Sequence, residues 1–530
     1  TTKINFMKKI FFIPILLLIL SCQDEKKIIK DITITTKSDE ARKIFLEALY
    51  ADEGNLASNE IADLLRGAIA KDSDFILAKA LLNSSFLRPT PGTNIKILSD
   101  IVNNSLDQVS EMEALLIRVY YHVATREYEK VMALLDELTS KYSNISRLWQ
   151  FSGMIKSYNG DIYEAIDDLN TTIEMNPENY SANMFLMAKH IVVGNLGNML
   201  PVQERDLNEA KKYIDKLIEI DPNNSYGYTM AGNYERSNNN FKKGIEYYTQ
   251  VGEIPSNNNN NVYSSNHYLA LSYTFTEDYD KAETYFRRNI EIAQGGWNTQ
   301  ARNFLGNLYV FSGELDKAAE ALDEYIEAMP TLEFSVVREN IVRAQLHFNK
   351  FLCYSHNQLE SESLNEIKLH SDYLNRLIEY RKSSYTKEQF EAIQNSNNHR
   401  SLLLNTWHDI LFGKYSNARE KLNLVKIYAD ENIKTNPEAY YDYNALNGMV
   451  QLNEGNFDEA IKYFSKNKSL EIAGEMEMDG DYFDYFYALA LKGSGQTDKS
   501  NKILKRLSTN NFYGYGRGLV RLLSIEQLKS

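Results

Sequence analysis

From about residue 40 onwards, apolar residues recur at the three- and four-residue spacing that predicts amphipathic helices. The stretch RNFLGNLYVFSGELDKAAEALDEYIEAMP, residues 302–330, holds two such runs on either side of Gly313 and ends at Pro330. A small residue stands in each run, at Gly306 and at Ala318, with bulky residues beside it. The pattern predicts two antiparallel helices whose backbones approach each other at the small residues, and a proline that ends the second helix.

This unit of two helices recurs along the chain. The equivalent position of the second helix falls, at intervals of 34, 45, 34, 38 and 36 residues, at Val131, Ala165, Ala210, Gly244, Ala282 and Ala318. The longest interval contains the turn-rich stretch GNLGNMLPVQE, residues 194–204, which we interpret as an insertion between two units. One helix pair cannot bury its apolar face alone, so we expect the pairs to stack into a continuous array.

The order of large, small and aromatic residues, followed by alanine, a bulky residue and proline, resembles the tetratricopeptide repeat (TPR). The resemblance implies an all-α fold, a TPR-type α-solenoid in which antiparallel helix pairs form a right-handed superhelix. We expect a TPR array over residues 40–333 and a second one over 387–510. Residues 334–386 lack the consensus small residues and are interpreted as divergent helical repeats. Residues 511–530 are predicted to form a capping helix that covers the last open face.

A glycine-rich stretch, FYGYGRGLV, precedes this last predicted helix. Its glycines, Gly514, Gly516 and Gly518, follow the spacing G-x-G-x-G, and no strand pattern leads into them. A phosphate-binding loop normally follows a strand, so we interpret this stretch as a flexible turn before the capping helix.

The first residues read as a targeting segment. Met7 is a plausible start, Lys8 and Lys9 supply positive charge, and an eleven-residue apolar run, too short to span a bilayer, follows. The sequence Ile-Leu-Ser-Cys that ends at Cys22 resembles the lipobox of bacterial lipoproteins. The resemblance implies a signal peptide over residues 1–21, cleavage before Cys22, and lipidation of its thiol. An ordinary cleaved signal with an incidental cysteine is the alternative.

The residues after Cys22 suggest where in the cell the protein is located. Gln23 at the next position implies, by the same resemblance, transport to an outer membrane, and Gln23-Asp24-Glu25 is similar to the acidic export signal of Bacteroidetes lipoproteins. We therefore expect an outer-membrane lipoprotein, facing the periplasm or the cell surface, and a polar tether over residues 22–39. Acyl chains at one residue anchor a protein without a membrane span.

Composition and motifs argue against nucleic-acid binding and catalysis. The net charge is −14, whereas nucleic-acid partners require basic stripes. The eight histidines form no H-E-x-x-H pair, and no G-x-S-x-G or G-K-[ST] motif occurs. We therefore expect no enzyme, no cofactor and no metal. Cys353, the second of the two cysteines, lies among aromatic residues and is predicted to be buried.

The remaining candidate site is a surface. In TPR proteins the concave face, lined by first helices, usually binds a peptide or protein partner. Transferred to this chain, that face nominates Tyr226, Asn233, Arg236, His267, Phe275, Gln300, Asn303 and Asn307. Asparagines and a cation in one groove suit a peptide backbone or a terminal carboxylate. Asn233 and Asn307 share the asparagine position of the carboxylate clamp in chaperone-binding TPR domains, although the clamp lysines are missing.

These features favour a non-catalytic TPR scaffold lipoprotein that binds a protein or peptide partner in a secretion, gliding or outer-membrane assembly. The alternative is a glycan-binding lipoprotein resembling the SusD-like family, which also uses TPR helices. The usual apolar–proline motif of that family is missing from CQDEKKIIKDITITT. A cytoplasmic regulatory TPR module would require that residues 1–21 are not a signal peptide.

Overall fold

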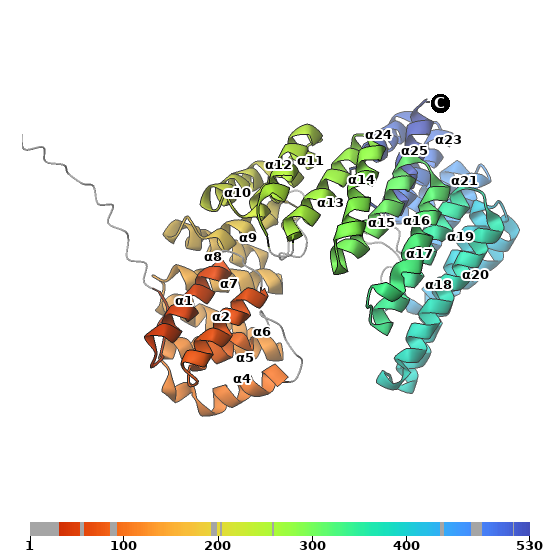
Figure 1. Cartoon of the computed structure of the whole chain (residues 1–530). Helices are drawn as coiled ribbons and strands as arrows, with labels where there is room; N and C mark the ends of the chain where they lie inside the picture. The colour runs from red at the N-terminus through yellow and green to blue at the C-terminus, as the bar shows by residue number, and fades with distance from the viewer. Residues whose placement is uncertain are drawn as a thin grey trace, which may run out of the picture. The chain divides into compact units, whose positions relative to one another are not determined.

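The computed structural model describes residues 31–53, 58–84, 93–191, 199–201, 204–256, 259–434, 439–467, 480–511 and 513–529. All regular secondary structure within these ranges is helical (Figure 1), which confirms the predicted all-α, TPR-type solenoid. The chain divides into two compact units, one that ends at Ile220 and one that begins at Asp221. We call them unit 1 and unit 2 and describe each separately.

Unit 1 is built from antiparallel helix pairs. Neighbouring helices pack in sequence order, with α1 against α2, α5 against α6, α7 against α8 and α9 against α10. The helices are α1 (Asp39–Glu53), α2 (Ser58–Lys71), α3 (Ile76–Leu82), α4 (Thr93–Asn104), η1 (Leu106–Gln108), α5 (Glu111–Thr125), α6 (Tyr128–Lys141), α7 (Ser146–Asn159), α8 (Ile162–Met175), α9 (Tyr180–His190) and α10 (Leu207–Ile220).

Residues 31–38, the described part of the predicted polar tether, dock on unit 1. Ile32 and Ile34 are buried, because alternate side chains of this extended stretch face the core. Thr35 donates from its backbone N–H to Glu113 Oε1 of α5 over 2.7 Å and from its hydroxyl to Glu113 Oε2 over 2.5 Å. The expectation of a tether up to residue 39 is therefore wrong for this stretch. Burying the side chains of its two isoleucines lowers the free energy of the folded chain, so the stretch packs on the core.

Arg147 of α7 fastens both the N-terminal stretch and α1. Its guanidinium donates to both carboxylate oxygens of Asp31, over 2.9 and 3.0 Å, and lies 2.8 Å from Glu53 Oε1. It also donates to the carbonyl oxygen of Leu49 over 3.2 Å. The Asp31 pKa is lowered, since the bond and charge of Arg147 outweigh the burial that would raise it.

Unit 2 continues the pattern, with α11 against α12, α13 against α14, α15 against α16 and α21 against α22. The helices are α11 (Ser225–Ser237), α12 (Phe241–Glu253), α13 (Asn260–Phe275), α14 (Tyr279–Ile292), α15 (Gly295–Ser312), α16 (Leu315–Ala328), η4 (Met329–Thr331), α17 (Val336–His356), α18 (Glu360–Tyr380), η5 (Lys382–Ser384), α19 (Lys387–Leu411), α20 (Tyr415–Asn432), α21 (Tyr441–Asn453), α22 (Phe457–Asn467), α23 (Gly480–Gly493), α24 (Thr497–Ser508) and α25 (Tyr515–Lys529).

The small residues play the packing role that the sequence pattern predicts. A Cβ atom on Gly232 of α11 would lie 2.3 Å from the Tyr248 ring of α12. A Cβ atom on Gly448 of α21 would lie 2.8 Å from the Phe464 ring of α22. Both distances are far below van der Waals contact, so only glycine lets a large aromatic ring of the second helix lie directly on the first helix.

The stretch predicted as divergent repeats, residues 334–386, forms the long helices α17 and α18, of 21 residues each. A buried ionic cluster joins them, in addition to a hydrogen bond of 2.7 Å between the buried hydroxyls of Ser355 and Ser363. The Glu366 carboxylate of α18 lies 2.5 Å from His347 Nδ1 and 3.0 Å from Lys350 Nζ, both on α17. Lys350 also reaches Asp323 of α16 over 2.7 Å, so the cluster ties three successive helices together.

Two further observations concern membrane and redox chemistry. No helix within the described ranges is both long and apolar enough to cross a membrane. Cys353 of α17 is fully buried, as predicted, and burial raises the pKa of its thiol to about 12. A thiol with that pKa stays protonated at neutral pH and packs as a small apolar group.

Candidate partner-binding face

The eight nominated groove residues all lie on first helices of unit 2. Tyr226, Asn233 and Arg236 come from α11, His267 and Phe275 from α13, and Gln300, Asn303 and Asn307 from α15. We call the surface formed by α11, α13, α15 and α17 the first-helix face. No observation of bound ligand tests these assignments, so the residues remain predictions, but the structure shows what each side chain contacts.

Several nominated residues are committed to packing within unit 2. Asn233 is buried, and its Oδ1 accepts a hydrogen bond of 2.9 Å from the Tyr248 hydroxyl. His267 lies among aromatic rings, the nearest being Phe304 at 4.8 Å. Burial, and then the positive charge of Arg236, lower the His267 pKa to about 3, so the ring is neutral at physiological pH. Asn233 and His267 therefore serve the core rather than an open groove.

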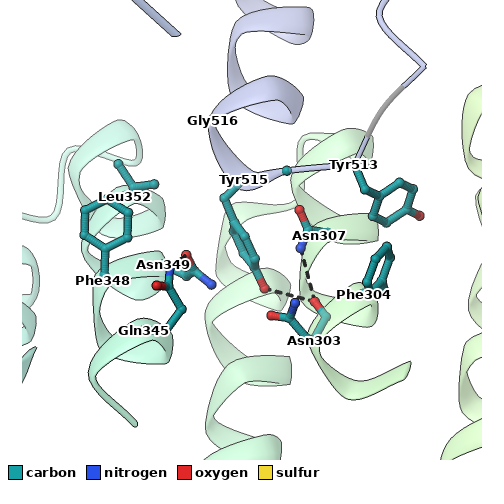
Figure 2. Close-up of a pocket in the computed structure, with 11 residues that line it drawn as sticks. Asn303, Phe304, Asn307, Gln345, Phe348, Asn349, Leu352, Tyr513, Tyr515 and Gly516 are labelled. Atoms are coloured by element: carbon teal, nitrogen blue, oxygen red, sulfur yellow. Dashed lines mark hydrogen bonds between the residues drawn. The ribbon is translucent and has the colours of Figure 1, made fainter. Parts of the chain in front are cut away.

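The chain's own C-terminal end occupies part of the first-helix face. We call Asn511 and Tyr513–Gly516 the C-terminal segment. The Arg236 guanidinium donates to the backbone carbonyl oxygen of Asn511 over 2.9 Å. In return, the side-chain amide of Asn511 donates to the backbone carbonyl oxygen of Arg236 over 2.9 Å. Tyr515 donates from its hydroxyl to the carbonyl oxygen of Asn303 over 3.2 Å (Figure 2). Residues predicted to hold a partner thus hold this segment.

Tyr513 is the main anchor of the C-terminal segment. Its ring stacks on Phe304 with 4.8 Å between centroids and on Phe311 with 5.2 Å, and it meets Phe275 edge-on at 5.5 Å. Its hydroxyl lies 2.5 Å from the hydroxyl of Thr274. Burial raises the Tyr513 pKa, so the phenol stays neutral. Phe275, nominated as a partner contact, is therefore covered by Tyr513.

Helix α25 begins within this segment, at Tyr515, and is more than an end cap. It packs on α24 and α23, as a capping helix would, but it also packs on α15, ten helices earlier in the chain. A Cβ atom on Gly518 would lie 2.9 Å from Val310 and 3.0 Å from Phe311, so this glycine permits the close approach of α25 to α15. The prediction of residues 511–530 as an end cap accounts for the packing on α23 and α24 but not for the packing on α15. An end cap is expected to contact only the helices that are near it in sequence.

A pocket remains beside the C-terminal segment. It has a volume of about 320 Å³ and lies between α15, α17 and the first residues of α25 (Figure 2). The side chains and backbone that line it belong to Asn303, Phe304, Asn307, Gln345, Phe348, Asn349, Leu352, Tyr513, Gly514, Tyr515 and Gly516. Of the eight nominated residues, the pocket brings together Asn303 and Asn307. Tyr226 and Gln300 are half-buried and lie outside it.

The α17 wall of the pocket was not predicted from the sequence. Gln345, Phe348, Asn349 and Leu352 fall in the stretch without consensus small residues, so the repeat register could not be extended to them. The available signal was the i, i+4 pair of amides, Gln345 and Asn349, because buried amides require hydrogen-bonding partners. In the structure, Gln345 Nε2 donates to Asn349 Oδ1 over 3.2 Å.

The chemistry of the first-helix face suits binding. The pocket is lined by amides, aromatic rings and backbone, none of which carries a charge. Within the described ranges, no group of three histidine, cysteine, aspartate or glutamate residues could hold a metal ion. Cys22, the predicted lipidation site, and the predicted signal peptide lie outside the described residues.

Comparison with known families bears on two segments. Residues 192–224 and 263–295 match the family model described as tetratricopeptide repeat. The second match covers most of α13 and α14, which form one helix pair and include His267 and Phe275. No curated protein matches the sequence.

Solved structures with a similar fold include three from signalling and peptide-binding proteins. The apo form of the quorum sensor NprR from B. thuringiensis is 14% identical and covers 63% of this chain and 97% of its own, with a TM-score of 0.41. A Rap protein complexed with competence and sporulation factor is 13% identical, covering 79% and 99%, with a TM-score of 0.33. YrrB, a TPR protein with an unusual peptide-binding site, is 20% identical, covering 39% and 91%, with a TM-score of 0.25.

At these identities and TM-scores, none of the three carries an argument about the function of this chain. The glycine-mediated helix pairs and the two matched segments nevertheless agree with each other. Together they show that the chain contains tetratricopeptide repeats.

Proposed function

We propose that this chain is a lipid-anchored scaffold of the bacterial cell envelope that holds a protein partner on the first-helix face of unit 2. TPR arrays are protein-interaction scaffolds, and their repeated helices create extended binding surfaces. The lipobox-like sequence before Cys22 supports the anchor, and the residues after it support an outer-membrane address, facing the periplasm or the surface. The partner would belong to a secretion, gliding or outer-membrane assembly.

One observation carries the binding part of this proposal. The first-helix face already holds a segment from the C-terminal end of the chain, since Arg236 and Asn303 bond to the C-terminal segment and Phe275 packs on Tyr513. The contacts combine a cation on a backbone carbonyl, an amide on a backbone carbonyl and stacked aromatic rings. These are the contacts by which a groove recognises a peptide, and the neighbouring pocket extends the same surface.

A photo-crosslinking experiment tests the partner. Benzoylphenylalanine replaces Gln300, one helical turn before Asn303 on α15, in the full chain expressed in its native host. Ultraviolet light should join this position to a discrete protein in the membrane fraction. The matched control position is Lys317 on the second helix α16, whose side chain is exposed and should give no such product. The same product from both positions, or binding to polysaccharides without any crosslinked protein, would contradict the proposal.

The anchor has its own test. Metabolic labelling with a clickable palmitate should tag the wild-type chain and not the Cys22→Ala variant, because the thiol of Cys22 would carry the thioether-linked lipid. The labelled protein should remain with the membranes after washing in high salt, since acyl chains hold it by burial rather than by charge. Equal labelling of both proteins would show that Cys22 is not the anchor.

A further inference from the structure

The pocket between α15, α17 and the C-terminal segment is a part of the first-helix face with room for a ligand. Tyr513 and Tyr515 fill the adjoining groove, where they pack on Phe304 and reach Asn303 (Figure 2). A partner chain therefore cannot run through this region as a long extended strand. A group that protrudes from the partner, such as a side chain or a tight turn, fits a volume of about 320 Å³.

The uncharged lining of the pocket limits the kind of partner group that it can bind. The lining side chains are amides, aromatic rings and one leucine, and burial raises the pKa of both Tyr513 and Tyr515, so they stay neutral. Moving an unpaired charge into such surroundings is strongly unfavourable. A carboxylate beside the first turn of α25 would also face the lone pairs of Asn307. The pocket therefore selects an uncharged group.

Hydrogen bonding narrows the choice further. Asn307 is 3% exposed, and its Nδ2 donates to the carbonyl oxygen of Asn303 over 3.3 Å. Its Oδ1 is buried without a donor among the described residues. A buried amide oxygen that lacks a donor is unfavourable, because it has given up its hydrogen bonds to water without replacing them. The α15 wall of the pocket therefore requires a donor from whatever fills it.

The α17 wall offers a hydrogen-bond donor, whereas the α15 wall offers an acceptor. Asn349 is 4% exposed, and its Oδ1 already accepts from Gln345 Nε2 over 3.2 Å. Its Nδ2 is thus the atom with hydrogens left to give, and in Figure 2 it points towards the space between α17 and α15. An acceptor on one wall and a donor on the other match a group that has one N–H donor and one carbonyl acceptor.

We propose that this pocket binds an amide group of the protein partner, which donates its N–H to Asn307 Oδ1 and accepts from Asn349 Nδ2. The inference rests on the proposed function, because a protein or peptide partner supplies the amide. Two sources share this chemistry, the side chain of an asparagine or glutamine and a main-chain amide within a turn. A hydrogen bond to each wall satisfies both buried asparagines, which no charged or purely apolar group does.

Selection from random peptides tests the proposal. The full chain carrying Cys22→Ser, to keep it off membranes, is panned against phage that display random 12-residue peptides. Enriched peptides are synthesised, and their affinities are measured by fluorescence polarisation. Asn307→Leu keeps the side-chain size and removes the acceptor, so it should weaken binding at least tenfold, and Asn349→Leu should do the same. Thermal melting of each variant checks that it is folded.

The control variant and the peptide variants separate the sources of the amide. Asn405→Leu is the matched control, because Asn405 on α19 makes the same bond to the carbonyl four residues earlier but lies outside the pocket. It should leave binding unchanged. Peptides with each asparagine or glutamine replaced by leucine, and peptides N-methylated at each amide, identify the group. A critical N-methylation, which removes only the N–H, should cost tenfold with the wild type and nothing further with Asn307→Leu. A critical change to leucine also removes the carbonyl that accepts from Asn349, so it should cost nothing further only when both Asn307 and Asn349 are replaced by leucine.

Two outcomes would overturn the inference, and they differ in what they leave standing. Equal affinity of the wild type and both pocket variants would overturn the pocket while preserving peptide binding by the first-helix face. Failure to enrich any peptide would also overturn it. In that case the proposed function falls only if crosslinking from Gln300 fails as well.

Discussion

Single atoms decide how closely the C-terminal segment approaches α15. A Cβ atom on Gly306 would lie 2.3 Å from the Tyr515 hydroxyl, which donates to the carbonyl oxygen of Asn303 on the same helix. The glycine therefore has two functions, since it fits the small position of its repeat and also receives a residue more than two hundred positions later. The sequence pattern predicts the first of these functions and contains no sign of the second.

We predict that Gly306→Ala destabilises unit 2 by about 1–3 kcal/mol, because the added methyl group overpacks the contact with Tyr515. Tyr515→Phe alone should cost about 0.5–1.5 kcal/mol for the lost hydrogen bond. In the double variant the alanine should cost less than it does alone, since the oxygen it meets is gone. Urea denaturation of the four proteins measures this coupling.

Gly296→Ala is the control for that cycle. Gly296 lies in the same helix, and a Cβ atom there would meet nothing within 4 Å. Alanine at this position should be neutral or stabilising, because it favours the helix over the unfolded chain. Strictly additive free energies for Gly306→Ala and Tyr515→Phe would show that the two residues do not contact each other.

At the scale of elements, the helix pairs could be predicted because each carries its own signal of small, bulky and aromatic positions. The terminal elements could not, since their contacts join segments far apart in sequence. Residues 31–38 dock through Thr35 on α5, and α25 packs on α15. The α17 wall of the pocket escaped prediction because residues 334–386 lack the consensus small residues that set the repeat register, and the cluster of His347, Lys350 and Glu366 that helps to join α17 and α18 leaves no such pattern.

We predict that Arg147→Ala releases the N-terminal stretch without unfolding the rest of unit 1. The substitution leaves Asp31 and Glu53 without the cation that now neutralises both. Hydrogen exchange of the Thr35 amide, which bonds to Glu113, should accelerate at least tenfold. Lys37→Ala is the control, since its ion pair with Asp74 is exposed and contributes little. Unchanged exchange in Arg147→Ala would mean that Glu113 and the buried isoleucines hold the stretch alone.

At the scale of the whole chain, buried neutral histidines are concentrated in unit 2. Burial is the largest cause that lowers the pKa of His267 to about 3 and the pKa values of His356, His370 and His399 to about 4. Between these values and the ordinary 6.5, the unfolded chain binds protons that the folded unit does not. The stability of unit 2 therefore falls as the pH falls from about 6.5 towards 4.

We predict that the urea midpoint of unit 2 is clearly lower at pH 5 than at pH 7, since each such histidine contributes about 1.4 kcal/mol per pH unit in this window. Trp297 and Trp407 report on unit 2 by fluorescence once Trp149 of unit 1 is replaced by phenylalanine. His370→Gln should reduce the dependence on pH. A midpoint that is the same at both pH values would show that these histidines titrate normally in the folded state.

If Cys22 carries a lipid anchor, as proposed, the contact between Asp31 and Arg147 also limits how far unit 1 can lie from the membrane. With lipid on Cys22, eight residues would separate the anchor from Asp31, the residue that Arg147 holds. Even when this chain is fully extended, the distance from Cys22 to Asp31 is only about 30 Å. Asp31, and the part of unit 1 that binds it, would then lie within about that distance of the bilayer. Loss of the ion pair between Arg147 and Asp31 would lengthen the free chain between Cys22 and unit 1, and unit 1 could then lie farther from the bilayer.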